Sequence, residues 1–297
     1  QQQAEYNKMM NDLTSAGEEA VSMLIDMINA PGKGSNSKVD YALSGLTHYV
    51  IAAGNEDSRL AIANAYLKAL DKVSERETKA FIIRQLQLMG KDECIDALTS
   101  YLNDENLSGP AARALASIGS ENSAKALSAS LLRRSGTPKT QKDIILAIAD
   151  IQAQGTEEAL RAMLGSGDEN MQKEVLYALS RVGSKASLKD LADAAAKAGY
   201  TMEKTGANEA YVTLIKRVAE QGDVKDAEKA ANDLLKKATK VGKIQSRDAA
   251  MQILMSLKKD NVTKLLLTAL KDQCKEYRNA ALNYASDYAD KNMYIEL

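Results

Sequence analysis

Apolar residues recur at spacings of three and four positions along most of this 297-residue chain. Such spacing places the apolar side chains on one face of an α-helix, where a neighbouring element can bury them. Runs of Val, Ile, Thr and Tyr in strict alternation with polar residues, which would indicate β-strands, are absent from the sequence. The pattern therefore predicts an all-α protein.

A glycine follows many of these amphipathic segments at intervals typical of a helix pair. The glycines are Gly54, Gly90, Gly119, Gly155, Gly183 and Gly222, with separations of 36, 29, 36, 28 and 39 residues. A residue just after a helix often adopts the left-handed conformation, which glycine adopts without a steric cost. We therefore expect each glycine to end one helix, and a second helix to begin within a few residues, so that each interval is one two-helix unit.

The segments before these glycines share one apolar face. Four positions before the glycine stand Val50, Leu86, Leu115, Ile151, Leu179 and Val218. The residues seven and eight positions before it are mostly apolar as well. One helix pair cannot bury such a stripe, whereas pairs stacked side by side bury it continuously. The sequence therefore predicts a single array of about seven to eight stacked helix pairs over residues 1–297, with a polar helix within residues 1–16 that caps the first pair.

Two of the copies carry a motif that resembles the HEAT repeat in its short bacterial form. The copies are Ala-Arg-Ala-Leu-Ala-Ser-Ile-Gly at 112–119 and Val-Leu-Tyr-Ala-Leu-Ser-Arg-Val-Gly at 175–183. The resemblance extends over residues 17–290, with departures at 32–37, at 201–208 and at Lys258-Lys259, where the expected glycine is replaced. It implies a right-handed α-solenoid, a superhelix of stacked helix pairs, and it implies no reaction.

The positions six residues before the glycines lie off the apolar stripe. They are His48, Arg84, Arg113, Ala149, Tyr177 and Lys216. Stacked repeats would align them along one face, and the HEAT resemblance implies that this face is the concave one. Because Arg and Tyr are frequent at binding hot spots, we predict that His48, Arg84, Arg113, Tyr177 and Lys216 bind an acidic or extended partner. The partner is then a protein or a neighbouring domain of the same polypeptide. The alternative is an ordinary solvated face whose long side chains cover the helices beneath.

Charge is nearly balanced overall but uneven along the chain. Lys and Arg total 39 and Asp and Glu total 40, which gives a formal net charge of −1. Much of the basic excess in the second half of the chain falls within residues 236–259, at Lys236, Lys237, Lys240, Lys243, Arg247, Lys258 and Lys259. A basic stretch can bind phosphates or other anions, which is one alternative function. The overall neutrality and the absence of Trp argue against nucleic acid as a partner.

The side chains that support most catalytic and metal sites are scarce. His48 is the single histidine, whereas nucleophilic catalysis usually needs a histidine base and zinc needs three or four ligands. The stretch Gly32-Lys33-Gly34-Ser35 lacks the spacing of a phosphate-binding loop. Acidic pairs such as Asp92-Glu93 and Glu157-Glu158 stand at predicted helix starts, where they complement the helix dipole. We therefore predict no enzymatic activity, no metal and no cofactor.

The two cysteines, Cys94 and Cys274, are expected to be free, buried thiols rather than a disulfide. No apolar run is long enough to span a bilayer. The start at Gln1-Gln2-Gln3 favours a processed, periplasmic or secreted product, and the resemblance to the short form of the repeat implies a bacterial one. Residues 292–297 favour a chain that continues past Leu297. A further alternative function is therefore an accessory region of a larger exported carbohydrate-active enzyme.

Overall fold

The computed structural model describes residues 2–166, 168–258 and 262–288, and the regular structure in these ranges is helical throughout. Within these described ranges, two short 3₁₀ helices, η1 (Asp92–Cys94) and η2 (Lys185–Ser187), accompany seventeen α-helices. The α-helices are α1 (Gln2–Ala16), α2 (Glu18–Asp26), α3 (Ser37–Ala53), α4 (Glu56–Lys72), α5 (Arg76–Met89), α6 (Ile95–Ser100), α7 (Ser108–Ile118), α8 (Glu121–Arg133), α9 (Pro138–Ile151), α10 (Glu157–Met163), α11 (Glu169–Val182), α12 (Leu188–Lys197), α13 (Ala207–Glu220), α14 (Val224–Lys240), α15 (Ile244–Leu257), α16 (Val262–Leu270) and α17 (Lys275–Tyr288). The all-α prediction is confirmed.

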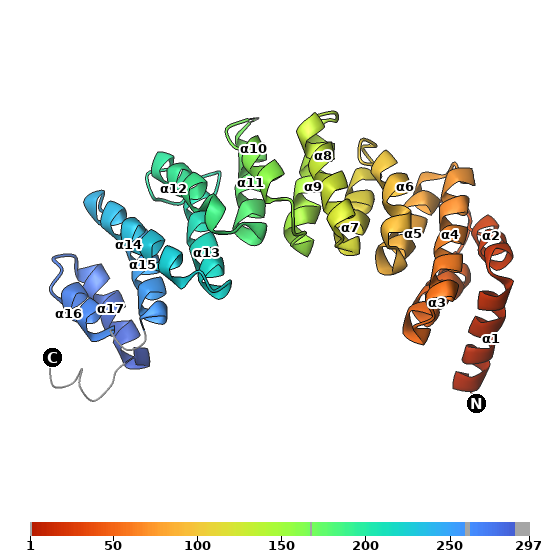
Figure 1. Ribbon diagram of the computed structural model, residues 1–297, viewed down its shortest axis with the longest axis horizontal. Helices are drawn as coiled ribbons and strands as arrows, with labels where there is room; N and C mark the ends of the chain where they lie inside the picture. Colours follow the sequence, from red (N-terminus) through yellow and green to blue (C-terminus); the bar gives the residue numbers. More distant parts are fainter. Residues whose placement is uncertain (1, 167, 259–261, 289–297) are drawn as a thin grey trace. The chain divides into compact units, whose positions relative to one another are not determined.

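The chain divides into two compact units, unit 1 (Gln1–Ala159) and unit 2 (Leu160–Leu297). In unit 1, α1, α3, α5, α7 and α9 form one layer in which each helix contacts the next, and the even-numbered helices form a second layer (Figure 1). In unit 2, α11, α13, α15 and α17 form the corresponding layer, with α12, α14 and α16 packed against it. Taken in chain order after α1, the helices in the described ranges make eight consecutive pairs, which agrees with the predicted number.

The predicted apolar stripe is buried, with one exception in α9. Of the residues four positions before a glycine, all are at most 1% exposed except Ile151, which is half-buried. The exception arises because α9 ends at Ile151 and the next residue, Gln152, adopts the left-handed conformation at φ 56°. Gly155 lies three residues further on, so Ile148 takes the buried place in this copy and is 0% exposed.

Four of the six predicted glycines directly follow the last residue of a helix, and these four junctions are of two kinds. Gly54 and Gly119 have φ of 64° and 67° and end α3 and α7 in the left-handed conformation, as predicted. Gly90 and Gly183 are instead extended, with φ of −69° and −67°. A Cβ atom would stand 2.6 Å from the carbonyl oxygen of Leu86 at Gly90, and 2.4 Å from that of Leu179 at Gly183. The left-handed prediction is wrong at these two junctions, where glycine is needed because the chain passes so close to the preceding helix.

Both extended junctions lead into a 3₁₀ helix. Gly90 is followed by η1 and Gly183 by η2, and the last residues of these turns, Cys94 and Ser187, are both fully buried. The chain therefore repeats one junction in both units, with a thiol in one copy and a hydroxyl in the other.

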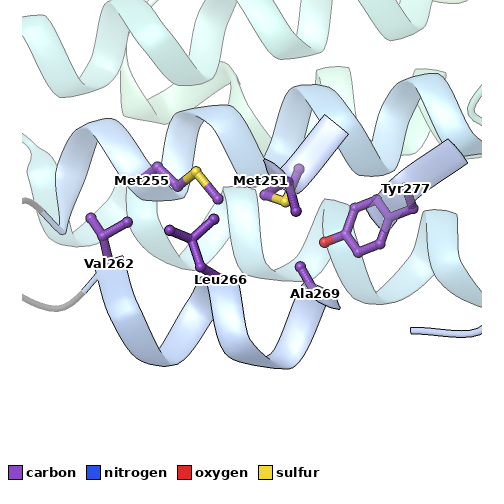
Figure 2. Close-up of a cluster of buried hydrophobic side chains, with 7 residues drawn as sticks. Met251, Met255, Val262, Leu266, Ala269 and Tyr277 are labelled. Atoms are coloured by element: carbon purple, nitrogen blue, oxygen red, sulfur yellow. The ribbon is translucent and has the colours of Figure 1, made fainter. Parts of the chain in front are cut away.

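The ends of the described chain are packed in different ways. At the start, α1 confirms a helix within residues 1–16; it contacts α2 and α3 and buries Met10. Its role as a cap stays a prediction. At the other end, α15, α16 and α17 share an apolar cluster, in which Met251 and Met255 lie over α16 and the ring of Tyr277 lies beside Ala269 (Figure 2).

Candidate partner-binding faces

The predicted binding residues lie at equivalent places on the odd-numbered helices, and we call those of each unit its partner row. In unit 1 the row comprises His48 on α3, Arg84 on α5 and Arg113 on α7. In unit 2 it comprises Tyr177 on α11 and Lys216 on α13. All five side chains are exposed, and the residue that follows each along the chain, with the exception of Arg217 and Tyr49, is buried. The row therefore stands on helices whose opposite faces form the core.

Ala149 does not belong to the partner row. It is 0% exposed, because the helix end at Gln152 shifts the register of α9 by three positions relative to Gly155. Counting six positions back from Gln152 gives Leu146, which is half-buried. The α9 copy therefore contributes an apolar side chain at this place.

In unit 1 the row is partly neutralised by carboxylates of the same unit. The guanidinium of Arg113 pairs with Asp150 of α9 at 3.0 Å, and both side chains remain exposed. Arg84 lines a small hollow of about 140 Å³ together with Asp40, Glu75 and Glu77. The carboxylate of Glu75 accepts a hydrogen bond from the backbone N–H of Thr78 at 2.7 Å and so caps α5. A partner of unit 1 would therefore meet a mixed surface rather than a purely cationic one.

In unit 2 the row borders a groove between α13 and α15, which we call the α13–α15 groove. Its volume is about 450 Å³, and it is lined by Lys216 and Glu220 of α13 and by Gln252, Ile253, Ser256 and Leu257 of α15. Gln252 occupies the row position of α15, six residues before Lys258. The sequence prediction missed it because Lys258-Lys259 stands where other copies have glycine; counting back from the replaced junction would have found it.

Tyr177, the other row residue of unit 2, has a cationic neighbour one turn along α11. The guanidinium of Arg181 lies 5.8 Å from the centre of the Tyr177 ring, within the range of a cation–π interaction. Tyr177 itself remains 41% exposed. Tyr177 therefore offers a flat amphipathic surface of the kind that binding sites often use.

The basic stretch 236–259 does not form one free cationic patch in the described residues. Arg247 is buried against Tyr277 and pairs with Asp272 at 2.5 Å. Lys237 pairs with Asp233 at 3.0 Å, and Lys258 pairs with Glu228 at 2.9 Å. Lys259 lies outside the described residues. Arg247 is thus part of the core, and Lys237 and Lys258 are already paired with carboxylates. These contacts weaken the case for an anion-binding site in this stretch.

A buried arginine organises the junction after α5. Arg59 of α4 donates to the backbone oxygen of Met89 at 2.8 Å, to Glu93 at 2.6 Å and to Glu56 at 2.7 Å. Hydrogen bonds from Arg59 and Lys91 lower the pKa of Glu56 to about 2. Burial, with help from the nearby charge of Glu93, raises the pKa of the Cys94 thiol to about 12. Arg59 and its partners therefore form a structural ion-pair cluster, which we call the Arg59 clamp, and the thiol of Cys94 beside it is unreactive.

The cysteines are free, as expected, but only one of them is buried. Cys94 is buried, whereas Cys274 is half-exposed and its thiol donates to the carboxylate of Glu276 at 3.3 Å. The expectation of two buried thiols is thus wrong for Cys274. Cys274 directly precedes α17, and its neighbours Gln273 and Lys275 are both exposed.

The other sequence candidates for chemistry lie apart from one another. His48 is an exposed member of the partner row, and the glycine-rich stretch at 32–35 lies in the loop between α2 and α3. In the described ranges, groups of three or more His, Cys, Asp or Glu side chains that could hold a metal ion are absent. The same ranges contain no helix with the length and apolar character needed to cross a bilayer.

Comparison with known proteins agrees with the helix-pair architecture. A search among curated proteins found no match. A family model described as HEAT repeats matches residues 129–212, from the end of α8 into α13. Proteins of this family are typically scaffolds for protein interaction and generally non-catalytic. Residues 129–212 of this chain are therefore HEAT repeats.

Proposed function

We propose that the protein is a non-catalytic binding scaffold, and that the partner rows of its two units bind extended, acidic segments of a protein partner or of a neighbouring domain. The observation that carries this proposal is the exposure of all five row side chains on helices whose other faces are buried. A helix held by its core cannot rotate without exposing apolar surface. The row residues are therefore preorganised, which reduces the ordering cost of binding.

The chemistry of the row supports the same conclusion. Arginine, lysine and tyrosine side chains present charge and flat apolar surface together, and such residues dominate the energetics of many interfaces. The similarity to HEAT repeats supports a scaffold over an enzyme. A partner that carries carboxylates would pair with Arg84, with Lys216 and, by displacing Asp150, with Arg113.

The test is a triple variant, Arg84→Ala, Arg113→Ala and Tyr177→Ala. We expect the amount of partner retained in quantitative pull-down to fall by about tenfold or more relative to the unmodified chain. A tenfold loss of affinity corresponds to about 1.4 kcal/mol of binding free energy. Helicity by circular dichroism should stay unchanged because the three side chains are exposed.

The matched control replaces three exposed lysines of the even-numbered helices, Lys125, Lys189 and Lys229, with Ala. It removes positive charge from the other layer and should leave partner retention intact. Equal retention by both triple variants would refute the partner rows as the binding surface.

A further inference from the structure

The α13–α15 groove contains two opposite charges that stand close together without forming an ion pair. Lys216 and Glu220 are one helical turn apart on α13 and both are exposed. Neither forms a salt bridge, with the other or with any further side chain of the described residues, whereas many i,i+4 pairs of this chain do, such as Lys189 with Asp193 at 2.8 Å. Both charges are therefore available to a ligand.

Another hollow of unit 2 shows the opposite situation. It has a volume of about 490 Å³ and is lined by Asp190, Asp193 and Glu203, among others. Asp190 accepts a hydrogen bond from Arg161 at 2.6 Å, Asp193 pairs with Lys189, and Glu203 accepts from the backbone N–H of Thr205 at 2.9 Å. Its carboxylates are already engaged, so the α13–α15 groove is the better candidate for a site.

The spacing of the two charges matches an extended peptide. Four residues of α-helix advance by about 6 Å. An extended chain advances by about 3.3 Å per residue, and its side chains i and i+2 point to the same side. An acidic residue at one position and a basic residue two positions along would therefore reach Lys216 and Glu220 at the same time.

The opposite wall of the groove suits the rest of such a peptide. Gln252 and Ser256 are also one turn apart on α15, and the side-chain amide of Gln252 offers both donors and an acceptor to a peptide backbone. The hydroxyl of Ser256 donates to the backbone oxygen of Ile253 at 2.7 Å, which leaves its oxygen free to accept. Leu257, which is half-buried, provides apolar surface for the methylene stems of the bound charged side chains, whereas Ile253 is only 2% exposed and forms the floor of the groove.

We propose that the α13–α15 groove binds an extended segment of a protein partner with the pattern acidic, any residue, basic. The carboxylate of the segment pairs with Lys216, and its cation pairs with Glu220. This assignment rests on the proposed scaffold function and names the recognition chemistry of one of its subsites.

The probe is the fluorescein-labelled peptide Gly-Ser-Ala-Glu-Ala-Lys-Ala-Ser-Gly, titrated with the full chain in fluorescence polarisation at low salt. The control peptide carries Gln in place of both Glu and Lys. We expect the charged probe to bind at least about tenfold more tightly than the control, with a preference that falls as salt is added. Equal binding of the two peptides would overturn the proposal.

A charge-swap series locates the site. Lys216→Glu and Glu220→Lys should each weaken probe binding by about tenfold or more, because each places two like charges in the groove. The double variant, Lys216→Glu with Glu220→Lys, should recover binding to within about threefold, since an extended peptide can enter in the reverse direction. Lys229→Ala on α14 is the matched control and should have no effect. Failure of the double variant to recover binding would overturn the proposal.

The outcome is separable from that of the scaffold proposal. The triple variant of Arg84, Arg113 and Tyr177 keeps both groove charges, so it should bind the probe normally while it loses its partner. If the unmodified chain captures a partner through the rows but does not discriminate between the two peptides, the groove assignment is overturned and the scaffold function stands.

Discussion

Each unit buries an arginine, but the two arginines are held by different groups. Arg59 in unit 1 is 7% exposed and bonds two carboxylates and a backbone oxygen. Arg247 in unit 2 is 6% exposed, pairs with the single carboxylate of Asp272 and lies 3.9 Å from the centre of the Tyr277 ring, while its Nε has no hydrogen-bond partner. Unit 1 thus compensates a buried charge with opposite charge, and unit 2 does so partly with an aromatic face.

The comparison also shows how neighbouring repeats are joined. Arg59 reaches from α4 to Glu93 in η1, and Arg247 reaches from α15 to Asp272 beyond α16. In both units the apolar stripe supplies the burial, and one long cationic side chain links its helix to a segment that lies beyond the next helix of the chain. The contributions of Arg59 and Arg247 to the stability of their own units can be measured separately.

The largest effect is expected for Arg59→Ala. It removes the ion-pair partner of Glu93, which is half-buried, and loss of one member of a buried pair typically costs about 3–5 kcal/mol. Hydrogen exchange should show the loss of protection in α4 and α5. The control is Lys91→Ala, which removes only an exposed pair with Glu56 and should cost less than about 1 kcal/mol. Equal effects of both variants would contradict the clamp.

Arg247→Ala should have a smaller effect, of about 2–3 kcal/mol, since it removes one charged hydrogen bond and one cation–π contact. The loss should appear in the exchange of α15 to α17 and leave α4 and α5 unchanged. Tyr277→Phe keeps the ring and should be nearly neutral, whereas Tyr277→Leu should reproduce about 1–2 kcal/mol of the loss. A full-sized loss in Tyr277→Phe would show that the hydroxyl, and not the ring, matters.

Gly183→Ala should cost about 1–3 kcal/mol in unit 2, because the new methyl group would be forced against the carbonyl of Leu179. Gly90→Ala should do the same in unit 1. Gly109→Ala is the control, since the nearest atom outside the adjacent residues stands at 3.8 Å and the new methyl group meets no backbone carbonyl. Thermal unfolding would distinguish these outcomes, and a stabilised Gly183→Ala variant would refute the close approach.

The smallest effect is a difference in how the two units respond to acid. The pKa of Glu56 is lowered to about 2, so its stabilising contribution is present above pH 4.5 and is lost as pH falls from 4.5 towards 2. Burial raises the pKa of Asp248 on α15, although a hydrogen bond from Tyr284 opposes the shift, so the ionised form of Asp248 disfavours folding at neutral pH. Asp248→Asn should therefore protect unit 2 at pH 7 and lose this advantage as pH falls. Exchange rates at several pH values would check both signs, and an advantage that grows in acid would contradict them.

The sequence predicted the helices, the paired organisation and almost all of the buried stripe, because apolar spacing reports directly on helix faces. It misplaced α9 because Gln152, a residue without a special preference, adopts the left-handed conformation in place of Gly155. It could not distinguish Gly90 and Gly183 from the other glycines, since the distance to the preceding carbonyl is a property of packing. The basic stretch was misleading for the same reason: Arg247 contacts Tyr277 and Asp272, which lie 30 and 25 residues further along.

The contrast between the two thiols has a practical consequence. Thiolate is the species that reacts with maleimides and other alkylating reagents, and burial keeps Cys94 protonated and covered. A dye offered to the native protein will therefore attach to Cys274, next to α17, without any engineering of the chain. Labelling of Cys94 will then require unit 1 to open, so the rate at which Cys94 is labelled reports the rate of local unfolding around η1.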